Sequence, residues 1–156
     1  EKNFLLGIKL VRGAYLEKER KRALKKQYES PIHKTKSETD RDFDTAIELI
    51  LENKKHIYLF CGTHNEKSTN LLVDLIKKHK IQNNNKRIFF SQLYGMSDNI
   101  SYSLKAKNFN VTKYLPYGPI IESIPYLIRR LNENSSVSEH SKKELKLIYK
   151  EIKNRK

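Results

Sequence analysis

Short apolar runs alternate with amphipathic segments along this chain, and this alternation is the feature that most restricts its fold. Four runs have the length of a strand: Leu5–Val11, Ile57–Cys61, Arg87–Phe90 and Asn110–Tyr114. Each run is followed by segments whose apolar residues recur at helical spacing. Strands that alternate with helices pair in parallel through right-handed crossovers. The pattern therefore predicts an α/β fold built on a parallel sheet.

Helices are predicted in the segments that follow the four strand runs. They cover Arg20–Gln27, Asp40–Glu52, Glu66–His79, Ser97–Lys107 and Ser123–Asn134. A last helix is predicted over about 138–156, because apolar residues recur there at helical spacing after the cap-like Ser141. No linker or internal repeat divides the chain, so we interpret residues 1–156 as part of one domain.

The length and the start of the chain favour a piece of a larger domain. A chain of 156 residues can bury a hydrophobic core, and no apolar run approaches the length of a membrane span. The chain begins at Glu1 and enters its first strand run almost at once. We therefore expect a fragment of a longer protein, from which no targeting segment can be read.

Cys61 is the only cysteine in the sequence, which excludes an intrachain disulfide and a cysteine-rich zinc site within it. It lies in an apolar strand run, and no motif of a cysteine nucleophile surrounds it. Inert packing in the core is therefore preferred over a reactive thiol.

The charge of the chain raises the question of a nucleic-acid or anionic-membrane partner. The 32 Lys and Arg residues against 18 Asp and Glu residues give a formal net charge of +14. The basic residues are dispersed among glutamates, and no stacking-aromatic motif of an RNA-binding sheet is present. We therefore predict no nucleic-acid partner, and a non-catalytic basic binding module is kept as an alternative function.

Polar and glycine-bearing clusters follow each strand run. The clusters are Lys9–Tyr15, Gly62–Asn65, Gln92–Met96 and Tyr114–Pro119. Because the carboxyl ends of parallel strands share one face, where ligands bind in α/β folds, the sequence predicts a ligand site there. Taken singly, the tyrosines of these clusters would favour half-buried strand packing, and the histidine a structural role.

The predicted helix Ser123–Asn134 carries two adjacent arginines on its polar side. Its apolar stripe is formed by Ile124, Leu127, Ile128 and Leu131, and the other side by Tyr126, Arg129, Arg130 and Glu133. Two neighbouring guanidiniums offer planar forks of donors that match a small carboxylate. The alternative is an ordinary solvated face with an ion pair between Arg129 and Glu133.

Four ordered motifs together resemble the proline dehydrogenase family, most closely its eukaryotic, mitochondrial branch. The motifs are Lys9–Tyr15, Thr63–Asn65, Gln92–Met96 and Tyr114–Asn134, and the resemblance covers roughly residues 4–135. It implies the C-terminal half of a distorted (β/α)8 barrel, with the strand runs as barrel strands five to eight. The predicted helix with the two arginines would then lie over the mouth of the barrel.

The resemblance assigns six residues to the substrate. They are Tyr15, Leu93, Tyr114, Tyr126, Arg129 and Arg130. The two arginines would bind the carboxylate of L-proline, and Tyr114 and Tyr126 would close around its ring. Tyr15 would add a further wall, and Leu93 an apolar contact.

The resemblance also implies FAD as the cofactor, with nine residues near it. They are Lys9, Val11, Arg12, Gly13, Ala14, Thr63, His64, Gln92 and Glu133. Lys9 would stand near the flavin ring, where a cation stabilises negative charge on the reduced isoalloxazine. Gly13 and Ala14 would let the backbone approach a planar ring or a phosphate closely. Glu133 would either fix the arginines or reach the flavin.

The implied reaction is oxidation of L-proline to 1-pyrroline-5-carboxylate, the first step of proline catabolism, with electrons passed to a quinone. The resemblance further implies a mitochondrial location on the matrix side, with peripheral association with the inner membrane. The missing N-terminal half of the barrel would be a required partner, so the isolated 156 residues are expected to be inactive. Hydroxyproline dehydrogenase of the same family is the closest alternative, and the phenol of Tyr114 favours proline over it.

Overall fold

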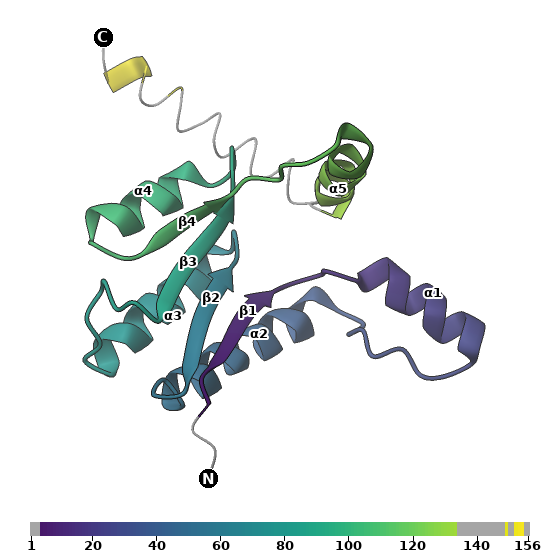
Figure 1. The fold of residues 1–156 in the computed structure, drawn as a ribbon, viewed down its shortest axis with the longest axis horizontal. Coiled ribbons are helices and arrows are strands. Elements are labelled where there is room, and N and C mark those ends of the chain that lie inside the picture. Colours follow the sequence, from purple (N-terminus) through teal and green to yellow (C-terminus); the bar gives the residue numbers. More distant parts are fainter. Residues whose placement is uncertain (1–3, 134–148, 150–151, 155–156) are drawn as a thin grey trace.

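Strands and helices alternate along the computed structural model, which describes residues 4–133, 149 and 152–154 (Figure 1). The strands are β1 (Leu6–Val11), β2 (Ile57–Gly62), β3 (Ile88–Leu93) and β4 (Val111–Tyr114). The helices are α1 (Leu16–Lys26), α2 (Lys36–Glu52), α3 (Glu66–Lys78), α4 (Asp98–Ala106) and α5 (Ile120–Glu133). Each predicted strand is therefore present, and its bounds shift by at most three residues.

The strands form one parallel sheet in the order β1-β2-β3-β4. Ile8 pairs with Leu59, which pairs in turn with Ile88 on the next strand. Each connection joins neighbouring strands and contains at least one helix. The predicted α/β fold with a parallel sheet is confirmed.

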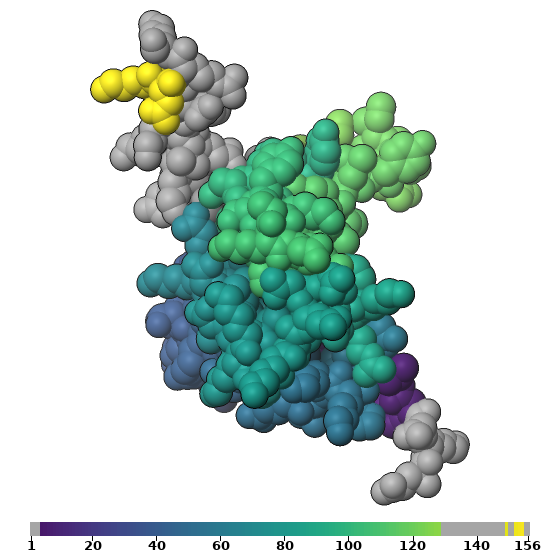
Figure 2. Space-filling view, turned by 90° about the vertical axis from the view of Figure 1, so that its left-hand side faces the viewer, coloured from purple at the N-terminus to yellow at the C-terminus, as the bar shows by residue number. Residues whose placement is uncertain are grey.

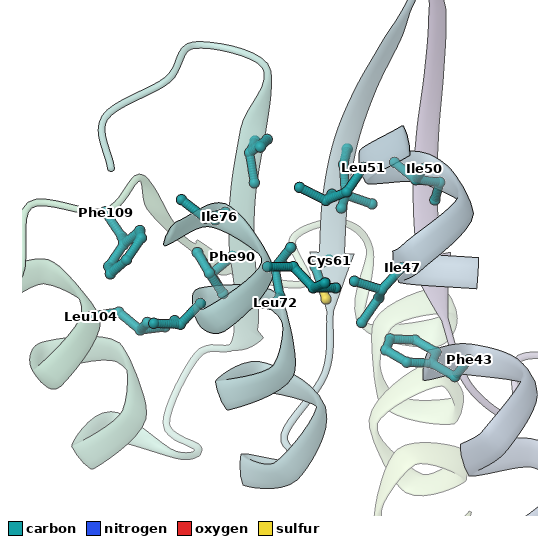
Figure 3. Packing of buried hydrophobic residues seen from close by; sticks show 14 of the residues in the cluster. Phe43, Ile47, Ile50, Leu51, Cys61, Leu72, Ile76, Phe90, Leu104 and Phe109 are labelled. Atoms are coloured by element: carbon teal, nitrogen blue, oxygen red, sulfur yellow. The ribbon is translucent and has the colours of Figure 1, made fainter. Parts of the chain in front are cut away.

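One face of the sheet is covered by α2, α3 and α4, and the hydrophobic core lies there. Leu59, Cys61 and Phe90 point to this face and are at most 1% exposed. Figure 3 shows the Cys61 sulfur between Leu72 of α3 and Ile47 of α2. In Figure 2 the green residues around α4 lie against the teal residues around α3. Burial raises the pKa of the Cys61 thiol to about 12, as expected for the predicted inert core cysteine.

The opposite face of the sheet carries the alternate residues of each strand, and α2, α3 and α4 do not cover it (Figure 1). We call it the open face. Phe60 and Phe89 stack there with ring centroids 4.6 Å apart, and Phe60 is 38% exposed. Val11 and Tyr114 lie on the same face and are 42% and 43% exposed.

Two predicted helix starts are four residues late, because a glycine turn before α1 and a capping box before α2 set them rather than apolar spacing. The first helix begins at Leu16 instead of Arg20, directly after the turn in which Gly13 has a φ of +68°. The second begins at Lys36 instead of Asp40. Thr35 caps it by accepting a hydrogen bond from the Glu38 amide, and the Glu38 side chain accepts one from the Thr35 amide.

The helix α5 begins at Ile120, three residues before the predicted start, and holds Pro125 within its early turns. In Figure 1 it lies beyond the carboxyl ends of the strands, apart from α2 and α3. The predicted terminal helix over about 138–156 falls largely outside the described residues, of which 149 and 152–154 are helical. Among the helices of the described residues, none has the length and apolar content needed to cross a bilayer.

Candidate functional site

Three side chains from three different elements meet on the open face, at the carboxyl ends of the strands. Lys9 of β1 places its Nζ 4.6 Å from the centroid of the Tyr114 ring of β4. The Tyr126 ring of α5 meets the Tyr114 ring edge to face, with centroids 6.0 Å apart. A cation against two phenol rings offers both a positive charge and apolar walls to a small ligand.

The contact between Lys9 and Tyr114 shows that the sheet curls toward its open face. In a flat sheet, strands about 4.8 Å apart would separate β1 from β4 by roughly 14 Å, with side chains standing perpendicular to it. Lys9 nevertheless reaches the ring of Tyr114 across β2 and β3. The curvature turns the open face into the concave side of the sheet.

The turn after β1 combines a left-handed glycine with a small residue. Gly13 has a φ of +68°, a conformation that favours glycine over any residue with a side chain. Ala14 follows, and Tyr15 then flanks the first turn of α1 with 66% of its surface exposed. Lys18 places its Nζ 5.9 Å from the Tyr15 ring centroid. The sequence-predicted residues of this turn are therefore accessible at the strand ends.

Val11 and Gly62 show that the open face needs a residue without a side chain at the end of β2. The two residues are partners in the register of β1 and β2. A Cβ atom at Gly62 would lie 2.8 Å from Cγ1 of Val11, closer than carbon atoms tolerate. Glycine at this position lets the Val11 side chain cover the end of the neighbouring strand.

His64 links the carboxyl end of β2 to that of β3. The Leu93 amide donates a hydrogen bond to His64 Nε2 at 3.4 Å, and the ring contacts Ser97 Oγ through Nδ1 at 2.9 Å. Because an amide can only donate, Nε2 must accept, which places the ring proton of this neutral tautomer on Nδ1. Ser97 itself holds a left-handed φ of +53°. The imidazole is thus fixed in one orientation at the strand ends.

Gln92 lies on the covered side of the sheet and is 1% exposed. Its amide nitrogen donates to the carbonyl of Thr63 at 3.3 Å, and its oxygen accepts from the Ser101 hydroxyl at 3.0 Å. These bonds tie the ends of β2 and β3 to α4. The side chain of Gln92 therefore supports the candidate site from behind and does not face the open side.

Arg12 also points to the covered side, because side chains alternate along a strand and Val11 before it faces the open side. Its guanidinium lies between α2 and α3, where it pairs with Asp40 and Asp44. Burial lowers the pKa of the Arg12 guanidinium, and the two carboxylates oppose that shift. The guanidinium keeps its charge in this setting, because arginine does not lose its proton in proteins.

The backbone of α5 contains positions 129, 130 and 133, but the side chains of Arg129, Arg130 and Glu133 lie outside the described part of the structure. Of the site residues predicted on this helix, Tyr126 has a described side chain, and its ring faces Tyr114. Among the described residues, no group of three or more His, Cys, Asp and Glu side chains could hold a metal ion.

A family model described as proline dehydrogenase matches residues 1–143 of the sequence. This chain belongs to the proline dehydrogenase family. The family predicted from the four motifs is thereby confirmed, and the motifs Lys9–Tyr15 and Tyr114–Asn134 both lie within the matched range.

Several members of the family resemble this chain. Proline dehydrogenase 1, mitochondrial, from Dictyostelium discoideum is 42% identical over 158 residues, which cover 98% of this chain and 28% of that protein. Hydroxyproline dehydrogenase from Xenopus laevis is 39% identical over 153 residues, which cover 96% of this chain and 33% of that protein. The chain thus spans a third or less of the length of these relatives.

A solved structure supports the same membership in the proline dehydrogenase family. Proline utilization A from Bdellovibrio bacteriovorus, inactivated by N-propargylglycine, aligns with a TM-score of 0.75 and 29% sequence identity. The alignment covers 82% of this chain and 13% of that one. Most of this chain therefore has the same fold as a part of that protein.

Sequence reasoning missed the side chains that hold the family motifs from behind. Asp40 and Asp44 bind Arg12, and Lys113 of β4 donates to the carbonyl of Met96 at 2.8 Å and pairs with Asp98. The twofold alternation within each strand carries the signal for this arrangement. It separates Lys9 and Val11, which face the open side, from Arg12 on the covered side.

Proposed function

We propose that this chain is part of an FAD-dependent enzyme that oxidises L-proline to 1-pyrroline-5-carboxylate. The observation that carries the proposal is the meeting of Lys9, Tyr114 and Tyr126 on the concave open face at the strand ends. Membership in the proline dehydrogenase family supplies the reaction class. A positive charge beside two aromatic walls suits a small zwitterionic ring compound next to a flavin that becomes anionic on reduction.

The residues at the strand ends fit a bound flavin. Gly13 and Ala14 leave the backbone of the turn after β1 uncovered by bulky side chains, so a planar ring or a phosphate can approach it. Lys9 offers a cation on the same face. FAD, when bound, supplies the chemistry that removes two electrons from the substrate carbon beside nitrogen. We propose that Lys9, Val11, Gly13, Ala14 and His64 lie nearest to it.

Three further residues of the proposed cofactor set act from the covered side. Arg12, Thr63 and Gln92 point their side chains into the protein, where they form hydrogen bonds with one another or with neighbouring helices. We propose that they reach the cofactor through the backbone that they hold. Glu133 of α5 is proposed either to fix the arginines or to reach the flavin.

The substrate would be held by the polar side of α5. Tyr126 faces Tyr114, and position 129 follows Tyr126 by three residues, which places it on the same side of the helix. We propose that Arg129 and Arg130 bind the proline carboxylate through their planar donor forks. Tyr15 and Leu93 would add further walls, since Leu93 is the register partner of Tyr114. The chain would thereby orient the substrate and exclude water around it.

The open face also supports completion of the domain by other segments of the protein. Within the described residues, β1 and β4 each pair with one strand only, and Leu5 and Leu6 beside the β1 edge are 54% and 46% exposed. Unpaired edges and exposed apolar faces are normally covered in native proteins. We propose that the missing half of a (β/α)8 barrel covers them, and that without it the chain is inactive.

The names of the relatives extend the proposal to location. Relatives from Dictyostelium discoideum, Caenorhabditis elegans and Homo sapiens are named mitochondrial. We propose a mitochondrial location for this protein as well, on the matrix side with peripheral attachment to the inner membrane. Its electrons would pass to a quinone.

Flavin absorbance of the full-length protein tests the proposal directly. Addition of L-proline without oxygen should bleach the flavin, because the substrate carbon then reduces it. Arg129→Met should require about 10- to 100-fold more L-proline, because a charge-assisted hydrogen bond contributes about 1.5–3 kcal/mol. Arg41→Met is the matched control, since this arginine of α2 is 71% exposed in its side chain and far from α5 in sequence. A colourless protein, or a flavin that L-proline does not bleach, would favour the basic binding module.

The alternative substrate is hydroxyproline, because the relative from Xenopus laevis is named hydroxyproline dehydrogenase. A smaller residue at position 114 would make room for the extra hydroxyl, whereas the phenol of Tyr114 fills that space. Tyr114→Ser should therefore raise kcat/KM for hydroxyproline relative to L-proline by about 10-fold or more. Equal preference in the parent protein would instead support the hydroxyproline alternative.

A further inference from the structure

We propose that Arg12 is a positioning residue, whose guanidinium holds the ends of β1 and β2 in the arrangement that the flavin requires. The proposal rests on the proposed FAD-dependent function. It concerns a cluster on the covered side of the sheet, formed by Arg12, Asp40, Asp44, Ser68 and Thr63, which we call the arginine clamp.

The contacts of the guanidinium join two helices to two strand ends. Nη1 donates to Thr63 Oγ1 at 2.8 Å, at the end of β2. Nη2 donates to Ser68 Oγ of α3 at 2.6 Å and lies 3.6 Å from Asp44 Oδ1 of α2. Nε forms an ion pair with Asp40 Oδ1 at 2.7 Å. Its N–H does not point at that oxygen, so this contact is not a hydrogen bond. The chain thus uses all three guanidinium nitrogens.

Packing and second partners fix the clamp further. The guanidinium carbon lies 3.6 Å from the centroid of the Phe43 ring, so the planar group is stacked as well as hydrogen-bonded. Ser68 donates to Asp44, and Lys36 pairs with Asp40, so both carboxylates have partners besides Arg12. The side chain of Arg12 is only 17% exposed. A group held from so many sides has one orientation.

The clamp lies directly behind the residues proposed to contact the flavin. Arg12 stands between Val11, which faces the open side, and Gly13, whose φ is +68°. Thr63 immediately precedes His64, which is fixed to the end of β3 by the Leu93 amide. The Thr63 hydroxyl also accepts from the Asn65 amide at 3.1 Å. Movement of the Arg12 side chain would therefore shift the backbone on both sides of the proposed flavin site.

A lysine could replace the charge of Arg12 but not its function. Its single ammonium group cannot reach Thr63, Ser68 and both aspartates in one plane, and it would not stack on Phe43 in the same way. The clamp therefore predicts that Arg12→Lys fails to restore the flavin site. A purely electrostatic contribution to folding would be largely restored by that change.

The experiment compares full-length parent, Arg12→Met, Arg12→Lys and the exposed control Arg41→Met. Each is stripped of flavin and titrated with FAD, with flavin fluorescence as the readout, and the urea midpoint is measured in parallel. Both Arg12 variants should bind FAD at least about 10-fold more weakly, because small displacements of site-forming backbone have effects of this size. Arg41→Met should bind FAD as the parent does.

If the Arg12 variants do not fold, variants at two partners of Arg12 in the clamp replace them. Ser68→Ala on α3 and Asp44→Asn on α2 remove one anchor each and leave the residues of the strand ends unchanged. They should weaken FAD binding about 3- to 10-fold in the same direction. The proposal is overturned if the Arg12 variants, or the Ser68 and Asp44 variants, bind FAD within about threefold of the parent. Such a result would show a merely structural role, whatever the urea midpoint.

The outcome also separates this inference from the function on which it rests. A parent protein that binds no FAD would remove the proposed function, and the positioning role with it. A parent that binds FAD and is bleached by L-proline, with variants of equal affinity, would remove the positioning role alone.

Discussion

The two faces of the sheet differ in what their side chains do. On the covered face, Leu59, Cys61 and Phe90 are at most 1% exposed and pack against three helices. On the open face, Val11 and Tyr114 remain more than 40% exposed, although they lie on β1 and β4, directly beside the strands of those buried residues. The difference indicates that the covered face supplies stability, whereas the open face keeps its side chains available for a ligand or for other segments.

Polar residues follow the same division. On the covered side, Gln92 and Arg12 form hydrogen bonds with neighbouring residues, and Arg12 Nε forms an ion pair without a hydrogen bond. On the open side, Lys9 rests against a tyrosine ring. Buried polar groups with satisfied partners fix a backbone, while an accessible cation can interact with a bound anion. Substitutions on each face test this difference between the two faces, if their effects on stability and on ligand binding are measured separately.

The largest effect on stability is expected from Phe90→Ala on the covered face. Phe90 is 1% exposed and meets Phe109 edge to face, with ring centroids 5.3 Å apart. Its truncation should lower the free energy of unfolding of the full-length protein by about 3–5 kcal/mol, because a cavity forms that the core cannot refill. Urea unfolding measures the loss. Tyr102→Ala, at a residue 73% exposed, is the control and should change stability by less than about 0.5 kcal/mol.

The second effect concerns pH and Cys61. Its pKa is raised from 9.0 to about 12 because burial disfavours the thiolate. As pH rises above 9.0, the unfolded chain loses this proton while the folded chain keeps it, so stability falls between 9.0 and about 12. The loss should reach up to about 1.4 kcal/mol per pH unit. Cys61→Ala should show a shallower decline over the same pH range.

Alkylation provides a second measurement of the same cysteine. At pH 8 the buried thiol of Cys61 should stay unmodified in the folded full-length protein and react once urea unfolds it. Mass spectrometry of the peptide that contains Cys61 follows the reaction. Rapid modification of the folded protein would show that the covered face opens readily, and the contrast between the two faces would then be smaller than the burial indicates.

The third effect is smaller and concerns the start of α2, which carries two aspartates of the clamp. Thr35→Ala removes the side-chain oxygen that caps the Glu38 amide. It should reduce the free energy of unfolding by about 1 kcal/mol, the usual contribution of such a cap. Thr35→Ser keeps the oxygen and should retain most of the stability. Equal losses in both variants would mean that the methyl group of Thr35, rather than its cap, stabilises the helix.

The sequence predicted the strands well because short apolar runs alternate with amphipathic segments along the chain. Strands that alternate with helices pair in parallel, so the direction of the strands could be predicted, and the register of β2 and β3 agrees with it. The start of α1 was predicted four residues late. Its first turn contains Glu17 and Glu19 instead of an apolar stripe, and the glycine turn before it sets the start.

Within the candidate site, prediction reached the residue positions but not their orientation. Lys9 and Arg12 were both assigned to the cofactor from the same motif, although strand alternation places them on opposite sides of the sheet. The partners of Arg12 come from α2 and α3, at sequence separations that a motif does not contain. Contacts between residues so far apart in the sequence depend on how the helices pack, and the residues around a motif do not reveal them.

The smallest stability effect is expected from Lys9→Met, and it is also the sharpest test of the comparison. Lys9 is exposed on the open face, and its contact with the Tyr114 ring should contribute at most about 0.5–1 kcal/mol. The urea midpoint of the full-length protein should therefore stay close to that of the parent. Reduction of the flavin by L-proline should slow about 10-fold or more, because the cation that stabilises the reduced ring is lost. Lys9→Arg should restore the rate, whereas a loss of stability like that of Phe90→Ala would show that the open face is also part of the folded core.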